Sequence, residues 1–114
     1  MELHVMKCDP NPGRLSPLTR KEILDYIRMV PGWEVRDRKL VRVYDFGNFQ
    51  RCEEFFTEIA DLSKREGHYP DICILEGKYV DVSFYTYPVG SLTVNDFIMA
   101  AKINFKERFK KGKM

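Results

Sequence analysis

The stretch from Phe49 to Arg65 constrains the fold of this 114-residue chain most strongly, because its apolar residues recur at helical spacing. That spacing places them along one side of an α-helix. The stripe consists of Phe49, Cys52, Phe55, Phe56, Ile59 and Leu62. Acidic residues come early and basic residues late, as the helix dipole favours, and Gly67 is a natural stop. We therefore expect one long helix with a single apolar face.

Four short strands are predicted, two before this helix and two after it. They span residues 33–35, 40–46, 71–75 and 79–85. In the later pair, Val80, Val82 and Phe84 occupy alternate positions, which is the period of a strand with one apolar face. In the earlier pair, Val41 and Val43 give one apolar face, and the opposite face is amphipathic. Each pair suits a hairpin, because only a few residues separate its strands.

Two capping boxes predict the starts of two further helices. Thr19 is followed three residues later by Glu22, and Thr93 is followed in the same way by Asp96. The first of these helices is expected to stop at Pro31. The resulting order is helix, strand, strand, helix, strand, strand, helix. It predicts an α+β fold in which three helices pack on one face of a four-stranded antiparallel sheet.

The length fits one domain that spans residues 1–114. Three of the six prolines lie between residues 7 and 18, and residues 1–17 are therefore predicted to form an irregular lead-in that does not pack. Residues 107–114 form a basic tail that is predicted to fray.

Composition argues against several classes of protein. The net charge of +2 is too small to argue for nucleic-acid binding, where a clustered basic face is expected, and no apolar run approaches the length of a membrane span. Three cysteines, Cys8, Cys52 and Cys73, form no CxxC pair, which argues against a disulfide framework or a zinc site. This cysteine pattern favours a reducing compartment, and the first residues lack the apolar centre of a signal peptide. We therefore expect a cytoplasmic protein.

The stretch from Glu66 to Asp71 carries the most chemistry, because it holds His68, one of two histidines in the chain. A histidine between a helix and a strand titrates near neutral pH and can exchange protons with a ligand. A surface histidine that stabilises a helix C-terminus through the dipole is the alternative, and the residues by themselves favour it. No partner lies at metal-ligand spacing, so a metal site is not predicted.

Tyrosines near the end of the last strand are the second candidate group. Tyr79 and Tyr85 suit an aromatic sheet face. Tyr87 lies beyond the strand end and is the tyrosine expected to point into a site. Asp96 is expected to act first as a helix cap and only second as a site residue.

Several motifs together resemble the pterin-4a-carbinolamine dehydratase family, whose members are also called 4a-hydroxytetrahydrobiopterin dehydratases. The resemblance covers nearly the whole chain. It rests on the segments Pro17–Ile23, Pro31–Glu34 and Val80–Phe84, on the signature residues Lys64, His68 and Pro70, and on Gly90, Leu92, Thr93 and Asp96. The family has a His-His pair in its signature and a third histidine after the following strand. Here Tyr69 stands in place of the second histidine and Tyr87 in place of the third.

The resemblance implies a lyase without a cofactor, which removes water from a 4a-hydroxytetrahydropterin to give the quinonoid dihydropterin. The reaction needs an acid for the leaving hydroxyl and a base for the N5 proton. His68 is then expected to be the base, because tyrosine has a pKa of about 10 and is a poor base at neutral pH. Tyr69 or Tyr87 is expected to orient or protonate the hydroxyl. The residues implied in substrate binding are Lys64, Pro70, Asp71 and Asp96.

The resemblance also allows a second class of function, a binding or assembly protein on the same scaffold. Family members act as a dimerisation cofactor for a homeodomain transcription factor, and relatives with altered sites act as Rubisco assembly factors. The expected partners are a pterin, further copies of the chain in a dimer or tetramer through a sheet edge and helices, and a protein client. Neither nucleic acid nor a membrane is expected. Retention of Lys64, His68, Pro70 and Asp96 favours the dehydratase, with an altered or weakened site.

Overall fold

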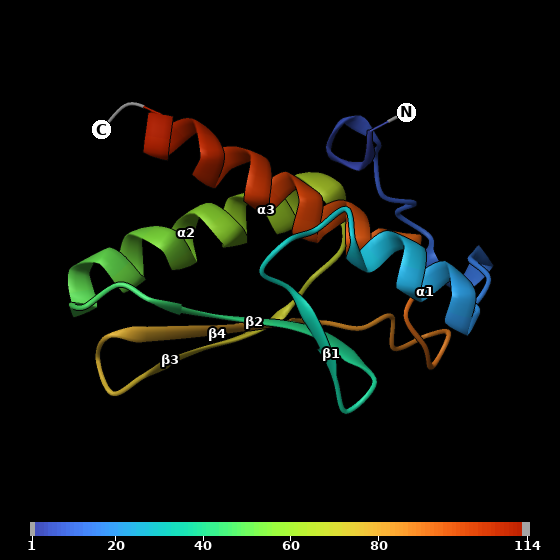
Figure 1. Cartoon of the computed structure of the whole chain (residues 1–114), viewed down its shortest axis with the longest axis horizontal. Coiled ribbons are helices and arrows are strands. Elements are labelled where there is room, and N and C mark those ends of the chain that lie inside the picture. The colour runs from blue at the N-terminus through green and yellow to red at the C-terminus, as the bar shows by residue number, and fades with distance from the viewer. Residues whose placement is uncertain (1, 113–114) are drawn as a thin grey trace.

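The elements of the computed structural model follow the predicted order, and the structure describes residues 2–112. The three helices are α1 (Arg20–Ile27), α2 (Phe49–Glu66) and α3 (Val94–Gly112). The four strands are β1 (Glu34–Arg36), β2 (Lys39–Asp45), β3 (Asp71–Leu75) and β4 (Tyr79–Phe84). Two short 3-10 helices, Leu3–Val5 and Pro12–Arg14, precede them. The predicted α+β fold is confirmed (Figure 1).

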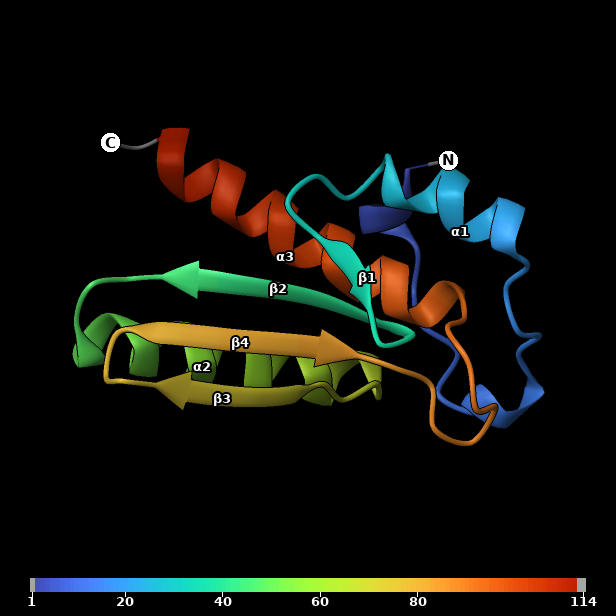
Figure 2. The ribbon, with the colours of Figure 1, turned by 60° about the horizontal axis from the view of Figure 1, so that its bottom comes forward.

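The four strands form one antiparallel sheet in the order β1-β2-β4-β3 (Figure 2). Figure 1 shows the helices on one side of this sheet. Leu40, Val80, Val82 and Phe84 are fully buried, and Leu40 lies opposite Phe84 in the central strand pair. Val43 lies on the other face, opposite Asp81, and is exposed. The amphipathic face of β2 is therefore the face that meets the helices.

Helix α2 contributes only part of its predicted stripe to the core. The buried members are Cys52, Phe55, Ile59 and Leu62. Phe49 and Phe56 are exposed, and the expectation that they share the buried face is wrong. At about 100° per residue, both phenylalanines lie at one margin of the stripe, beyond the arc that the core covers.

Helix α1 ends at Ile27, before the predicted stop at Pro31. The N–H groups of Met29 and Val30 donate to the carbonyls of Tyr26 and Ile27, three residues earlier, which is a tighter turn than the α-helix. A residue that precedes proline is also disfavoured in the α conformation, and Val30 is in that position. The turn closes the helix early.

The lead-in packs against the rest of the chain, contrary to the expectation for residues 1–17. Leu3 and Cys8 belong to the buried core. The ring of His4 stacks on Phe105, with 4.1 Å between the ring centroids. Figure 1 shows this segment beside α3. Isolated apolar residues with no periodicity carried no sequence signal for this packing.

The C-terminal end is helical as far as the structure describes it. The backbone of α3 continues to Gly112, so most of the predicted tail 107–114 extends the helix, and residues 113–114 lie outside the described residues. No helix within residues 2–112 is long and apolar enough to cross a membrane.

Candidate active site

His68 and Asp96 form a pair in the interior of the domain. Nε2 of His68 lies 2.7 Å from Oδ1 of Asp96, and the two residues are 5% and 0% exposed. The surface position that the residues by themselves favoured for His68 is therefore wrong. A histidine and a carboxylate at this distance form a charge-assisted hydrogen bond when either is ionised.

The ends of two helices position this pair. Gly67 ends α2 in the left-handed conformation with a φ of 69°, and its N–H donates to the carbonyl of Ser63 at 2.8 Å. This turn directs His68 inward, where its ring lies nearly parallel to that of Phe84, with centroids 6.1 Å apart. Asp96 comes from the first turn of α3. The pair therefore joins two segments separated by 28 positions in the sequence.

Asp96 accepts hydrogen bonds at both of its carboxylate oxygens. Oδ2 accepts from the N–H of Thr93 at 2.9 Å and from the hydroxyl of Thr86 at 2.8 Å. The predicted contact between Asp96 and the start of its own helix is therefore present. A carboxylate has only acceptors, so Nε2 of His68 carries the proton that points at Oδ1. In the neutral ring, Nδ1 then holds the lone pair.

A second group, which we call the surface triad, consists of Lys39, Asp71 and Tyr87. The hydroxyl of Tyr87 donates to Oδ2 of Asp71 at 2.5 Å, and Nζ of Lys39 donates to the same hydroxyl at 3.1 Å. Nζ of Lys39 also lies 3.9 Å from Oδ2 of Asp71. The hydrogen bond with Tyr87, followed by the nearby Asp71 carboxylate, raises the pKa of Lys39. Lys39 therefore presents a stable positive charge to the phenol oxygen.

The buried pair and the surface triad lie at the same end of the sheet. Asp71 begins β3, and it is paired with Ser83 near the end of β4. Thr86 links the two groups, because its hydroxyl binds Asp96 in the interior and the next residue, Tyr87, reaches Asp71 at the surface. The chemistry-bearing residues of two distant segments thus meet where one strand begins and its neighbour ends.

The other predicted site residues are exposed or half-buried, and so is Tyr87 of the surface triad. Tyr69 is 63% exposed and Tyr87 is 56% exposed, Pro70 is half-buried, and Lys64 is exposed in the last turn of α2. Sequence reasoning missed Lys39, which lies 48 positions before Tyr87 in a different hairpin. No local pattern distinguishes such a lysine, because only the tertiary fold brings it to the site.

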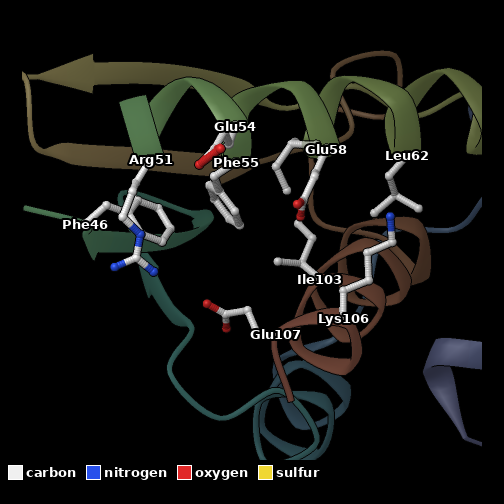
Figure 3. A pocket seen from close by; sticks show the side chains of 10 residues that line it. Phe46, Arg51, Glu54, Phe55, Glu58, Leu62, Ile103, Lys106 and Glu107 are labelled. Carbon is white, nitrogen blue, oxygen red and sulfur yellow. The ribbon is translucent and has the colours of Figure 1, made fainter. Parts of the chain in front are cut away.

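A cleft of about 220 Å³ lies apart from these groups, between α2 and the C-terminal half of α3 (Figure 3). Its lining residues are Phe46, Arg51, Glu54, Phe55, Glu58, Ile59, Leu62, Ile103, Lys106 and Glu107. The predicted site residues are not among them. Among the side chains that the structure describes, no three of His, Cys, Asp or Glu gather closely enough to hold a metal ion.

Known proteins are similar to this chain over most of its length. Residues 16–105 match the family described as pterin 4 alpha carbinolamine dehydratase. A Methylococcus capsulatus protein that carries this enzyme name provisionally is 40% identical over 104 residues, which cover 90% of each chain. Pterin-4-alpha-carbinolamine dehydratase 2, mitochondrial, of Arabidopsis thaliana is 35% identical over 108 residues, which cover 90% of this chain and 58% of the plant protein.

A solved structure shares the fold as well as part of the sequence. It is the crystal structure of transcriptional coactivator/pterin dehydratase from Brucella melitensis, with a TM-score of 0.73 and 26% identity. The match covers 79% of this chain and 97% of the Brucella chain. Together with the family match over residues 16–105, these similarities show that the chain belongs to the pterin 4 alpha carbinolamine dehydratase family.

Proposed function

We propose that this chain removes water from a 4a-hydroxytetrahydropterin, with His68 as the central group. The observation that carries the proposal is the buried hydrogen bond of 2.7 Å between His68 and Asp96. A carboxylate that holds Nε2–H fixes the orientation of the ring and leaves the lone pair of Nδ1 to accept a proton. Relatives that bear the name of this enzyme support the same chemistry.

In the proposed reaction, His68 is the base and Tyr87 is the acid. Nδ1 of His68 takes the proton from N5 of the pterin, and the electrons of that N–H bond form the C4a=N5 double bond. The C4a–O bond breaks, and the leaving oxygen takes the phenol proton of Tyr87 and departs as water. Asp96 then stabilises the doubly protonated His68, and the ammonium of Lys39 stabilises the phenolate. Proton exchange with solvent restores both groups.

Tyr87 is preferred over Tyr69 as the acid because Lys39 and Asp71 hold its hydroxyl in place. Tyr69 follows His68 directly and is exposed, and we assign it to orienting the substrate. Lys64, Pro70 and Asp71 remain proposed substrate contacts. Asp96 is fully buried, so its proposed role changes from substrate binding to positioning His68.

Stopped-flow measurement of the dehydration of a 4a-hydroxytetrahydropterin tests the proposal. Wild-type protein is expected to accelerate the reaction over its uncatalysed rate, and His68→Ala is expected to lose most of that acceleration. A wild-type rate equal to the uncatalysed rate would exclude the enzyme function.

Protein binding is the second candidate function, and exposed aromatic side chains on α2 favour it. Phe49 and Phe56 lie seven positions apart, which places them on the same side of the helix, and both are exposed. The similar Brucella melitensis protein is described as a transcriptional coactivator as well as a pterin dehydratase. If α2 binds a partner, the double variant Phe49→Ser/Phe56→Ser should lose that partner and keep the dehydration rate.

Self-association is part of the same proposal, because β3 is an edge strand of the sheet. An open edge presents unpaired backbone groups that a second copy of the chain can satisfy. Light scattering at several protein concentrations should then show a dimer or tetramer. A monomer at all concentrations would contradict this part of the proposal.

A further inference from the structure

Asn95 binds the lead-in of the chain next to the buried pair. Its side chain is fully buried. The N–H of Asp9 donates to Oδ1 of Asn95 at 2.9 Å, and Nδ2 of Asn95 donates to the carbonyl of Asp9 at 3.1 Å. The side-chain amide therefore pairs with one backbone residue in both directions. Because Asn95 immediately precedes Asp96, this contact fixes the backbone next to the residue that bears the carboxylate.

Glu66 binds the neighbouring residue of the lead-in from the other helix. The N–H of Cys8 donates to Oε1 of Glu66 at 2.9 Å, and the thiol of Cys8 lies 3.6 Å from the carbonyl oxygen of Asn95. Oε2 of Glu66 lies 3.6 Å from Nζ of Lys102 on α3. Glu66 is the last residue of α2 and lies two positions before His68.

We propose that residues 8–10, Glu66 and Asn95 form a clamp that positions His68 against Asp96. The clamp joins the end of α2 to the start of α3, and these are the two segments that carry the pair. Its effect on catalysis rests on the proposed function, whereas its effect on the ring of His68 does not.

Gly67 shows why a clamp matters at this place. It is the residue between Glu66 and His68, and its positive φ belongs to a region that glycine enters without strain. A glycine leaves the backbone more conformational freedom than any other residue, so the position of His68 depends on the contacts around it. Pro10 borders this position, because a Cβ added at Gly67 would lie 3.7 Å from Cα and Cβ of Pro10.

The clamp joins its segments through hydrogen bonds. A buried amide whose donor and acceptor are both paired fixes one arrangement, because any shift of the lead-in breaks two hydrogen bonds at once. Reacting groups displaced by about 1 Å can lose roughly a hundredfold in rate. The clamp residues are therefore positioning residues, and none of them is proposed to touch the substrate.

Asn95→Ala tests the clamp, and Asn104→Ala is the matched control. Asn104 also belongs to α3, and its side chain makes three hydrogen bonds, whereas that of Asn95 makes two. The three bonds join Asn104 to Nε1 of Trp33 at 3.0 Å, to Arg42 at 2.8 Å and to the carbonyl of Pro31 at 2.9 Å. Both changes remove an amide that links α3 to another segment, but only Asn95 lies beside Asp96.

The main readout is the ¹⁵N spectrum of the His68 ring at fixed pH, which reports which ring nitrogen carries the proton. Wild-type protein and Asn104→Ala are expected to show the proton on Nε2, and Asn95→Ala is expected to show a mixture of the two forms. On the proposed function, kcat of Asn95→Ala should also fall about tenfold or more with little change in KM. An unchanged His68 spectrum in Asn95→Ala, or an equal change in Asn104→Ala, would overturn the clamp.

Glu66 provides a second pair of variants in case Asn95→Ala does not fold. Glu66→Gln keeps an oxygen that accepts from Cys8, and Glu66→Ala does not. Only Glu66→Ala should alter the His68 spectrum, and no change in it would contradict the clamp. A wild-type protein without dehydratase activity, together with altered spectra in Asn95→Ala or Glu66→Ala, would leave the clamp standing and remove the proposed function.

Discussion

Nε2 of His68 and Oδ1 of Asp96 lie 2.7 Å apart in the interior of the domain, where Asp96 is fully buried and His68 keeps only 5% of its surface exposed. A buried ionisable group depends on its partner, because removing one member leaves the other without compensation. Loss of either member should therefore affect both the stability of the fold and the proposed reaction.

Asp96→Asn should reduce kcat by about 10²- to 10⁴-fold. The amide oxygen of Asn can still accept the N–H of Thr93, so the start of α3 is retained, but the negative charge that stabilises protonated His68 is lost. Steady-state rates combined with thermal unfolding measure the two effects separately. Asp61→Asn, an exposed acid on α2, is the control and should change neither quantity. Normal activity in Asp96→Asn would contradict the proposed role of Asp96 in positioning His68 and stabilising its protonated form.

Histidine placed at positions 69 and 87, where the family resemblance leads us to expect it, should raise the dehydration rate. Imidazole exchanges protons at neutral pH more readily than phenol does, so Tyr69→His and Tyr87→His should each increase kcat, by roughly tenfold or more if the tyrosines limit the site. Tyr79→His, on β4, is the control and should leave the rate unchanged. If neither site substitution raises the rate, the tyrosines do not limit catalysis.

Much of the secondary structure could be predicted from local patterns in the sequence. The strand predicted at residues 71–75 is observed at Asp71–Leu75, because Pro70 bounds it before and the turn at Gly77 bounds it after. The exposure of Phe49 and Phe56 could not be predicted, because the width of the buried face of α2 depends on the elements that pack against it. The packing of Leu3 and Cys8 could not be predicted either, because their partners lie far along the chain.

The candidate site was predictable only as a set of residue types. The position of His68 at a helix end was visible in the sequence, but its burial depends on Asp96, which lies 28 positions later. No sequence pattern marked Lys39 as a site residue, because it reaches Tyr87 only through the arrangement of β2 beside β4. Contacts of this kind are properties of the tertiary fold.

The stability of the wild-type protein should fall at alkaline pH relative to Cys8→Ala. Burial, assisted by the Glu66 carboxylate, raises the pKa of the Cys8 thiol from 9.0 to about 12. The folded state therefore keeps the proton over a range in which the unfolded state releases it, so this stabilising contribution is present below pH 9 and declines above it. The expected slope is about 1.4 kcal/mol per pH unit. Urea unfolding of both proteins between pH 8 and 10.5 measures it, and parallel pH profiles would contradict the raised pKa.

Thiol reactivity gives a separate prediction about the same segment. Cys73 is exposed, whereas Cys8 and Cys52 are buried. A thiol reagent should therefore modify Cys73 rapidly in the native protein and the other two only after unfolding. Cys73→Ser is the control and should abolish the fast phase. Rapid modification of Cys8 would contradict the packing of the lead-in.

Gly67→Ala should destabilise the protein by about 1 kcal/mol, because alanine does not readily adopt the left-handed conformation at the end of α2. Thermal or urea unfolding measures the change. Gly13→Ala is the control, because an added Cβ there meets only Oδ1 of Asn11 at 3.8 Å, and its stability should stay within about 0.5 kcal/mol of wild type. Equal stability of Gly67→Ala and wild type would contradict this conformation.

The proposed role of His68 as the base of the dehydration has a matched test, because the chain contains two histidines. The measurement is kcat/KM for a 4a-hydroxytetrahydropterin with His68→Gln and with His4→Gln. His4 stacks on Phe105 and has no role in the proposed reaction, so it serves as the control. His68→Gln is expected to lose at least about a hundredfold in kcat/KM, while His4→Gln is expected to keep the wild-type value. Equal kcat/KM values for the two variants would contradict the proposed role of His68.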